Sequence, residues 1–179
     1  MNAIEYERQK ELTDDFDSVR LRPIKDEDTD LIVRWRNNPV IRSQFIFREL
    51  FSSEMHRRWL SEKVYTGSVI QYIIEVEKNP IGSIYLRDVN LKNESGEFGI
   101  FIGEIGYHGK GYGTIATKMF VKYCFELGFH RIFLRVLDTN AAAQRSYIKA
   151  GFEYEGTARD MVYIDGIRYN VTFMSVIAK

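Results

Sequence analysis

A strand that runs through a glycine-rich turn into a helix is the feature that most limits how this chain can fold. Residues 98–102 form a short apolar run rich in β-branched and aromatic side chains, which predicts a buried strand. Glycines follow at positions 103, 106, 109, 111 and 113, and apolar residues then recur every three or four positions up to Cys124, as on one face of a helix. The N–H groups of such a turn, with the positive end of the helix dipole, can hold a phosphate or a pyrophosphate.

The glycines also fit a purely structural turn and, in part, two other phosphate-binding motifs. A phosphate-binding P-loop requires G-x-x-x-x-G-K-[ST], but Glu104 stands where the first glycine should be, and Gly111 follows Lys110. The dinucleotide fingerprint G-x-G-x-x-G/A fits from Gly111 onward, with Asp138 as a candidate ribose-binding acid. Seven residues, 104–110, nevertheless separate the strand from Gly111, whereas a dinucleotide turn follows its strand directly. A dinucleotide-binding oxidoreductase therefore stays a distant alternative.

Length and composition indicate one globular domain. The chain has 179 residues, of which 45% are hydrophobic, and no apolar run is long enough to span a membrane. Residues 1–17 show no period and predict an N-terminal extension, followed by a single domain over residues 18–179. The charged N-terminus does not resemble a signal sequence, and the single cysteine, Cys124, lies on the apolar helix face, so we expect a cytoplasmic protein.

Charge is balanced over the whole chain but not along it. The 25 basic residues equal the 25 acidic ones, which favours neither nucleic acid nor a membrane as a partner. Residues 34–58, however, contain six arginines against two glutamates. Such a run is commonly a solvated helix face, but if it lines a site it favours an anionic substrate.

The remaining elements predict a mixed α/β fold with a mostly antiparallel sheet of about seven strands and about four helices. One parallel crossover is expected between residues 98–102 and 131–137. The predicted strands are 19–23, 68–76, 80–86, 98–102, 131–137, 152–163 and 167–177. The predicted helices are 26–37, one starting at Ser52 or Ser53, one after Gly113, and 140–150, which Gly151 should end. Residues 37–39 should break the first helix, residues 90–96 should form a polar loop, and Asp165-Gly166 should form the turn of the last hairpin.

A second group of residues lies on the helix predicted from 140 to 150. Asn140, Ala143 and Tyr147 are three, four and seven positions apart and so share one face. Taken alone, Asn140 is explained as a helix cap and Tyr147 as a half-buried packing residue.

Together, the glycine turn and this helix resemble the GNAT superfamily of acetyl-CoA-dependent N-acetyltransferases. The family pattern [QR]-x-x-G-x-[GA] is matched by His108, Gly111 and Gly113, with histidine in the Gln/Arg place. The later pattern N-x-x-A-x-x-x-Y-x-K-x-G-F is complete at Asn140, Ala143, Tyr147, Lys149, Gly151 and Phe152. The order of elements also agrees over nearly the whole chain.

The resemblance implies a set of roles, with acetyl-CoA as co-substrate and no metal. Tyr147 would be the general acid for the departing thiolate, and Glu97 the general base, with His108 as the other candidate; Glu97 is otherwise explained as an exposed charge at a strand end. The coenzyme would also contact Asn140 and Ala143, and its pantetheine would pair with Ile100, Phe101 and Ile102. Its pyrophosphate would bind at His108, Gly109, Lys110, Gly111, Tyr112, Gly113 and Thr114.

The acceptor is suggested by a W-R-N-x-P stretch that begins at Trp35, similar to amino-sugar nucleotide N-acetyltransferases of the GNAT group. The candidate substrate-binding residues are Trp35, Arg36, Asn37 and Arg42. The favoured acceptor is a nucleotide-linked amino sugar, because Trp35 and Phe45 could flank a sugar or a base while the arginines meet phosphates. A protein N-terminal amine, another small amine and a non-catalytic acyl-CoA-binding module stay open. For the assembly, a homodimer stays open.

Overall fold

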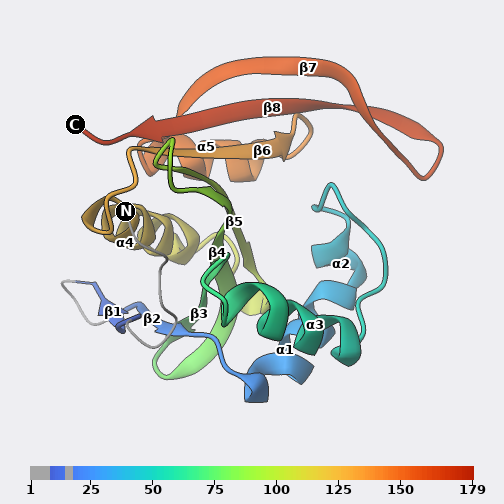
Figure 1. Ribbon diagram of the computed structural model, residues 1–179. Helices are drawn as coiled ribbons and strands as arrows, with labels where there is room; N and C mark the ends of the chain where they lie inside the picture. The colour runs from blue at the N-terminus through green and yellow to red at the C-terminus, as the bar shows by residue number, and fades with distance from the viewer. Residues whose placement is uncertain (1–8, 15–17) are drawn as a thin grey trace.

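In the computed structural model, residues 9–14 and 18–179 are described, and over them the chain forms a mixed sheet with helices on both faces (Figure 1). The sheet has eight strands in the order β1-β2-β3-β4-β5-β6-β8-β7 within this described part. The strands are β1 (Leu12–Thr13), β2 (Arg20–Pro23), β3 (Ile70–Val76), β4 (Asn79–Asn90), β5 (Ser95–Ile102), β6 (Arg131–Leu137), β7 (Glu153–Ile164) and β8 (Ile167–Ile177). The α-helices are α1 (Thr29–Asn37), α2 (Pro39–Arg42), α3 (Ser53–Trp59), α4 (Tyr112–Glu126) and α5 (Ala141–Lys149).

The predicted parallel crossover is confirmed, and it is short. β5 and β6 pair in parallel only from Ser95↔Arg131 to Glu97↔Phe133. Beyond that point β5 continues along β4 as far as Gly82↔Ile102, and β6 continues along β8 as far as Leu137↔Val171. The two strands therefore separate after Glu97, and we call the place where they part the strand fork. All the other strand pairs are antiparallel, as expected for the hairpins.

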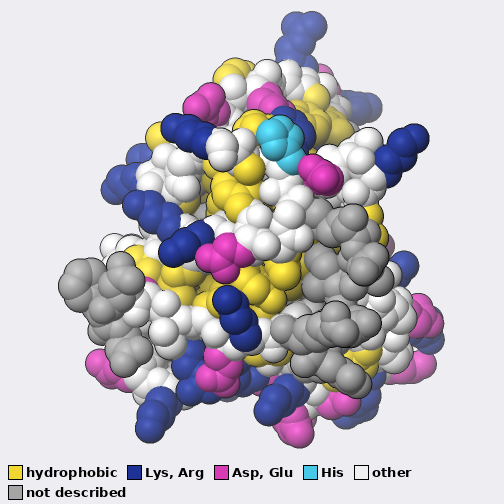
Figure 2. All heavy atoms as spheres, turned by 60° about the vertical axis from the view of Figure 1, so that its left-hand side comes forward, with side chains coloured by type: hydrophobic (Ala, Val, Ile, Leu, Met, Phe, Trp, Pro, Cys, Tyr) yellow, Lys and Arg dark blue, Asp and Glu magenta, His cyan; other side chains and the backbone are white. Residues whose placement is uncertain are grey.

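The helices cover opposite faces of the sheet because side chains alternate along each strand. On one face α4 and α5 pack against Phe98 and its neighbours, with Phe120, Cys124 and Tyr147 buried in the main core. On the other face Trp35 of α1 and Leu60, directly after α3, are buried against the strands. Figure 1 shows α4 and the α1–α3 group on the two sides of the central strands. Figure 2 shows the α4 side, where basic and acidic side chains are interspersed around apolar surface.

Several predicted boundaries are confirmed in detail. The Ser52 hydroxyl accepts a hydrogen bond from the N–H of Met55 and so caps α3. Gly151 takes a left-handed φ of 100° directly after α5, and Asp165-Gly166 forms the hairpin turn with φ values of 51° and 83°.

Other boundaries differ from the sequence prediction. The stretch after Asn37, predicted as a break, contains the short helix α2, because the Asn38 side chain accepts from the N–H of Val40 and Pro39 begins the turn. The loop predicted for residues 90–96 is largely strand, since β4 runs to Asn90 and β5 starts at Ser95. The helix predicted for residues 26–37 begins with a 3-10 turn, Asp26–Asp28, before α1.

Part of the predicted N-terminal extension contributes to the sheet. Leu12 pairs with Leu21, and the Tyr72 hydroxyl donates to the Lys10 carbonyl at 3.0 Å. Residues 1–8 and 15–17 of that prediction lie outside the described residues. Among the helices that the structure describes, none is long and apolar enough to cross a membrane.

Candidate active site

The glycine-rich turn presents a row of unused backbone donors at the start of α4. Gly109 and Gly111 have left-handed φ values of 72° and 89°, a conformation that side-chain-bearing residues rarely adopt. Within the part of the chain that the structure describes, none of the N–H groups of residues 109–113 donates a hydrogen bond. No side chain caps α4, whose positive dipole end lies at the same place. The turn therefore has the donors that a coenzyme pyrophosphate needs.

Two contacts fix this turn against the rest of the site. The His108 Nε2–H donates to the Ile102 carbonyl at 2.9 Å and ties the turn to the end of β5. The hydroxyls of Thr114 and Ser146 are hydrogen-bonded at 2.7 Å and join the start of α4 to α5. Because a carbonyl only accepts, His108 Nε2 carries a proton in this contact.

The face of α5 predicted to serve the site has one polar group at its start and one at its end. The Asn140 side-chain oxygen accepts from the N–H of Ala143 at 3.2 Å, so this residue caps the helix. Tyr147 is buried and lies edge-on to Phe98, with ring centroids 6.0 Å apart, and next to Phe152. Burial raises the pKa of the Tyr147 phenol above its ordinary value, so the group stays protonated at neutral pH. It can donate a proton at the strand fork.

The Glu97 carboxylate is occupied by two arginines. Arg135 donates to both of its oxygens at 3.0 and 2.9 Å, and Arg87 donates to one of them at 3.2 Å. Burial alone would raise the pKa of Glu97, but these bonds and charges outweigh it and hold the pKa below its usual range. A carboxylate with a lowered pKa is a weak proton acceptor, so the geometry argues against the base role predicted for Glu97.

On the other face of the sheet, the residues of the W-R-N-x-P stretch divide into supports and one free cation. Trp35 is buried, and its indole N–H donates to Glu104 at 2.8 Å. The Asn37 side chain exchanges two 2.8 Å hydrogen bonds with the backbone of Phe51. These two residues therefore hold the segment that follows α1, and their contact with an acceptor stays a prediction.

Arg36 is the free cation. Its guanidinium lies 4.0 Å from the ring centroid of Phe45 and 5.5 Å from that of Phe51, and it forms no hydrogen bond or ion pair with any residue in the described ranges. Burial lowers the pKa of Arg36. Phe45 in turn packs edge-on against Phe101 of β5, with centroids 5.5 Å apart, so Arg36 is held near the open part of β5.

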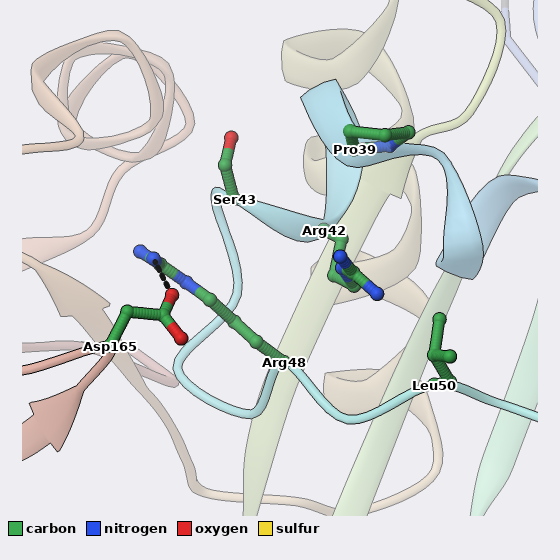
Figure 3. Close-up of a pocket in the computed structure, with 6 residues that line it drawn as sticks. All are labelled: Pro39, Arg42, Ser43, Arg48, Leu50 and Asp165. Atoms are coloured by element: carbon green, nitrogen blue, oxygen red, sulfur yellow. Dashed lines mark hydrogen bonds and ion pairs between the residues drawn. The ribbon is translucent and has the colours of Figure 1, made fainter.

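Arg42 lies in a different place, at a hollow of about 210 Å³ between α2, the segment that follows it and the β7–β8 turn (Figure 3). Arg48 spans the hollow to form an ion pair with Asp165 at 3.4 Å. The lining residues are Pro39, Arg42, Ser43, Arg48, Leu50 and Asp165. None of them is among the residues at the strand fork, so the structure separates the two arginines that the sequence prediction had grouped.

Three residues at the strand fork were missed from the sequence: Tyr85, Arg87 and Arg135. Arg87 and Arg135 reach Glu97 from the strands on either side of β5. The signal that could have found them is strand alternation, because Tyr85 and Arg87 lie opposite Gly99 and Glu97 once β4 and β5 are paired. Among the described residues there is no group of three or more His, Cys, Asp and Glu side chains that could hold a metal.

Comparison with known proteins decides the family. The family described as "Acetyltransferase (GNAT) domain" matches residues 18–153. The chain belongs to the GNAT acetyltransferase family. The GNAT fold predicted from the sequence is thus confirmed, as is an acetyl-CoA-dependent N-acetyltransferase domain.

Individual relatives differ in what they act on. The structure of spermidine N-acetyltransferase from Vibrio cholerae in complex with CoA and spermine is 26% identical, with a TM-score of 0.84, and the match covers 89% of this chain and 95% of that one. Spermidine N(1)-acetyltransferase of Escherichia coli K12 is 29% identical over 89% of this GNAT chain and 86% of its own length. Acetyltransferase PseH of Campylobacter jejuni is 28% identical over 79% of this chain and 87% of its own length.

The match to one further relative is partial. An uncharacterized protein of Methanocaldococcus jannaschii is 27% identical over 82% of this chain, but the match spans only 30% of that protein's length.

Proposed function

We propose that this GNAT enzyme transfers the acetyl group of acetyl-CoA to the primary amine of a nucleotide-linked amino sugar, by direct transfer in a ternary complex. The observation that supports this acceptor is Arg36, a half-buried guanidinium that stacks on Phe45 and has no counter-charge within the described residues. An unpaired buried charge is costly, and an anionic group on the substrate would compensate it. Arg42, in the hollow beside α2, would meet a second, more distant anionic group.

On the donor side, the free N–H groups of residues 109–113, with Thr114, would hold the pyrophosphate of the coenzyme. The pantetheine would lie along Ile100, Phe101 and Ile102, where β5 has left β6 and keeps only β4 as its neighbour. Asn140 spends its side-chain oxygen on the helix cap, so its amide N–H groups would face the coenzyme arm, beside the small side chain of Ala143.

The chemistry assigned to Tyr147 follows from its protonation. The amine nitrogen attacks the thioester carbonyl carbon, the C–N bond forms and the C–S bond breaks, and Tyr147 gives its phenolic proton to the departing sulfur. The surplus proton on the nitrogen returns to the tyrosine oxygen, directly or through water, so the enzyme ends unchanged. Positioning of the two reactants supplies most of the remaining effect.

Charge on the acceptor side separates the proposed acceptor from a polyamine. Arg87 and Arg135 place two guanidinium groups on one buried carboxylate, Glu97, while Asp88, 3.8 Å from Arg87, is exposed. Arg36 adds a third guanidinium that forms no ion pair within the described residues. Positive surroundings disfavour an ammonium ion, so they would hinder the entry of a polycation. The same surroundings lower the pKa of a bound amine and favour the neutral, nucleophilic form.

The test is a thiol-release assay with acetyl-CoA and a panel of amines. The panel contains a nucleoside-diphosphate amino hexose, the corresponding free amino hexose, spermidine and a short peptide with a free N-terminus. We expect the nucleotide-linked sugar to give the highest kcat/KM, and the free sugar to be at least about tenfold poorer, since it lacks the charge that Arg36 would bind. A preference for spermidine or the peptide would overturn the acceptor, and stabilisation by NAD(H) without stabilisation by CoA would overturn the reaction.

We also propose that the chain self-associates, with a homodimer as the smallest assembly. Support comes from a similar structure, a dodecameric spermidine N-acetyltransferase of Vibrio cholerae that is 26% identical with a TM-score of 0.77. Analytical ultracentrifugation tests this directly, and a single monomeric species at micromolar concentration would exclude it.

A further inference from the structure

Tyr85 lies on β4, at the strand fork, and its hydroxyl has no hydrogen-bond partner among the described residues. β4 and β5 pair so that Tyr85 stands opposite Gly99. A Cβ atom added to Gly99 would lie 2.3 Å from Cζ and 2.4 Å from the hydroxyl oxygen of Tyr85, which is closer than real Cβ atoms approach. The phenol end of Tyr85 therefore rests directly on the backbone of β5, in space that only glycine leaves open.

Tyr85 lies on the face of the sheet that α1 and α3 cover, where the acceptor is proposed to bind. The Arg87 guanidinium lies 5.9 Å from the centroid of its ring. Tyr85 also packs against the buried cluster around Trp35, together with Phe51, over which Arg36 stacks at 5.5 Å. Gly99 directly precedes Ile100, the first residue along which the pantetheine would lie, so Tyr85 and Tyr147 approach this stretch of β5 from opposite faces of the sheet.

We propose that the Tyr85 hydroxyl binds the attacking amine of the acceptor, by accepting a hydrogen bond from its N–H. This inference rests on the acetyl transfer proposed above but on no particular acceptor. A hydroxyl oxygen has two lone pairs and no charge, so it accepts from a neutral amine. The flanking guanidinium groups of Arg36 and Arg87 favour that neutral form. Bound in this way, the amine is fixed against β5 with its own lone pair left free for attack.

Two substitutions separate the hydroxyl from its position. Tyr85→Phe removes the oxygen and keeps the ring, whereas Gly99→Ala keeps the oxygen but forces the phenol to move. Gly156→Ala is the matched control, because a Cβ there would meet nothing within 4 Å, and that glycine lies on β7, away from the fork. Calorimetric binding of acetyl-CoA reports whether each variant is folded and holds the donor.

The readouts are the kcat/KM of the best amine in the panel and the binding of that amine to the CoA-saturated protein. For Tyr85→Phe and Gly99→Ala we expect both to fall by about tenfold or more, the size of one lost hydrogen bond to a reacting group, with acetyl-CoA affinity within about twofold of the wild type. Gly156→Ala should match the wild type.

The outcomes distinguish the two proposals. Amine binding and kcat/KM of Tyr85→Phe within about twofold of the wild type would overturn the role of Tyr85, whichever amine is acetylated. If the best amine is not a nucleotide-linked sugar but Tyr85→Phe still loses binding, the acceptor proposal fails and the role of Tyr85 stands. If the wild type releases no thiol with any amine, both proposals fall.

Discussion

Arg135 holds both oxygens of the Glu97 carboxylate, at 3.0 and 2.9 Å, at the point where β5 and β6 separate. The pair joins the two strands just before they diverge, and Arg87 adds a third bond from β4. Glu97 thus binds together the three strands at the base of the candidate site.

Glu97→Gln should therefore lower stability more than it lowers turnover. Removing one partner of a buried pair leaves the arginines uncompensated, and we expect a loss of about 2–4 kcal/mol in the free energy of unfolding, measured by denaturant titration.

The same pair makes stability depend on pH. Since the folded-state pKa of Glu97 lies below its ordinary value of 4.5, the stability that Glu97 contributes is present above about pH 4.5 and is lost as the pH falls through the folded pKa. In the variant this part of the acid destabilisation should disappear. An unchanged stability together with a hundredfold drop in kcat would instead restore Glu97 as the base.

Tyr147→Phe should lower kcat and leave acetyl-CoA binding within about twofold, since the phenolic proton is needed only as the thiolate departs. Because burial raises the pKa of Tyr147, ionisation of this residue should not produce an alkaline fall in kcat below about pH 10. Stopped-flow kinetics and calorimetry check the two parts. Tyr163→Phe, at a side chain exposed on β7, is the control and should behave as the wild type. Full activity of Tyr147→Phe would remove its role as an acid.

Gly111→Val should weaken acetyl-CoA binding. Gly111 has a φ of 89°, and a β-branched residue there either strains the turn by about 1–3 kcal/mol or changes its path, so the N–H groups of residues 109–113 no longer converge. Isothermal calorimetry measures the affinity. Gly106→Ala provides the comparison, because its Cβ would meet nothing within 4 Å and its φ is not left-handed. Equal affinity in the two variants would show that the turn does not hold the coenzyme.

Arg36→Ala should raise the KM for an anionic acceptor by about tenfold or more and leave acetyl-CoA affinity unchanged, since one charge-assisted hydrogen bond is lost. Arg36→Lys should not restore activity, because an ammonium group does not stack on Phe45 as a planar guanidinium does. Arg57→Ala, at an exposed position on α3, controls for a general loss of positive charge. Arg42→Ala tests the hollow separately; indifference of both Arg36→Ala and Arg42→Ala would discredit the sugar-nucleotide acceptor.

What the sequence predicted well is local in the chain. The turn at residues 109–113 and the hairpin at Asp165-Gly166 depend on glycine conformations that neighbouring residues do not alter, so pattern alone located them. Helices were likewise recognisable from their periodicity and their caps, as α3 was from its cap at Ser52. β1 escaped detection because two residues cannot show a period, and their strand conformation comes from pairing with β2.

What the sequence missed depends on contacts between distant residues. The sequence around Tyr85 does not predict that its phenol rests on Gly99, because this contact follows from the register of β4 on β5. The burial of Trp35 and the bonds between Asn37 and Phe51 are also tertiary, so the sequence motif did not reveal that these two residues support the local structure. The ion pairs of Glu97 could not be predicted from the sequence for the same reason, because Arg87 and Arg135 come from β4 and β6.

The parting of β5 from β6 leaves main-chain groups of β5 without a strand partner in the middle of the sheet and not at its margin. An unpaired strand at the margin of a sheet promotes aggregation. This inner edge instead suits a narrow, extended ligand that has amide groups of its own. Recognition by peptide groups places little demand on side-chain identity, so positions 100 and 102 should tolerate any β-branched residue, and drift there over evolutionary time would leave donor affinity intact.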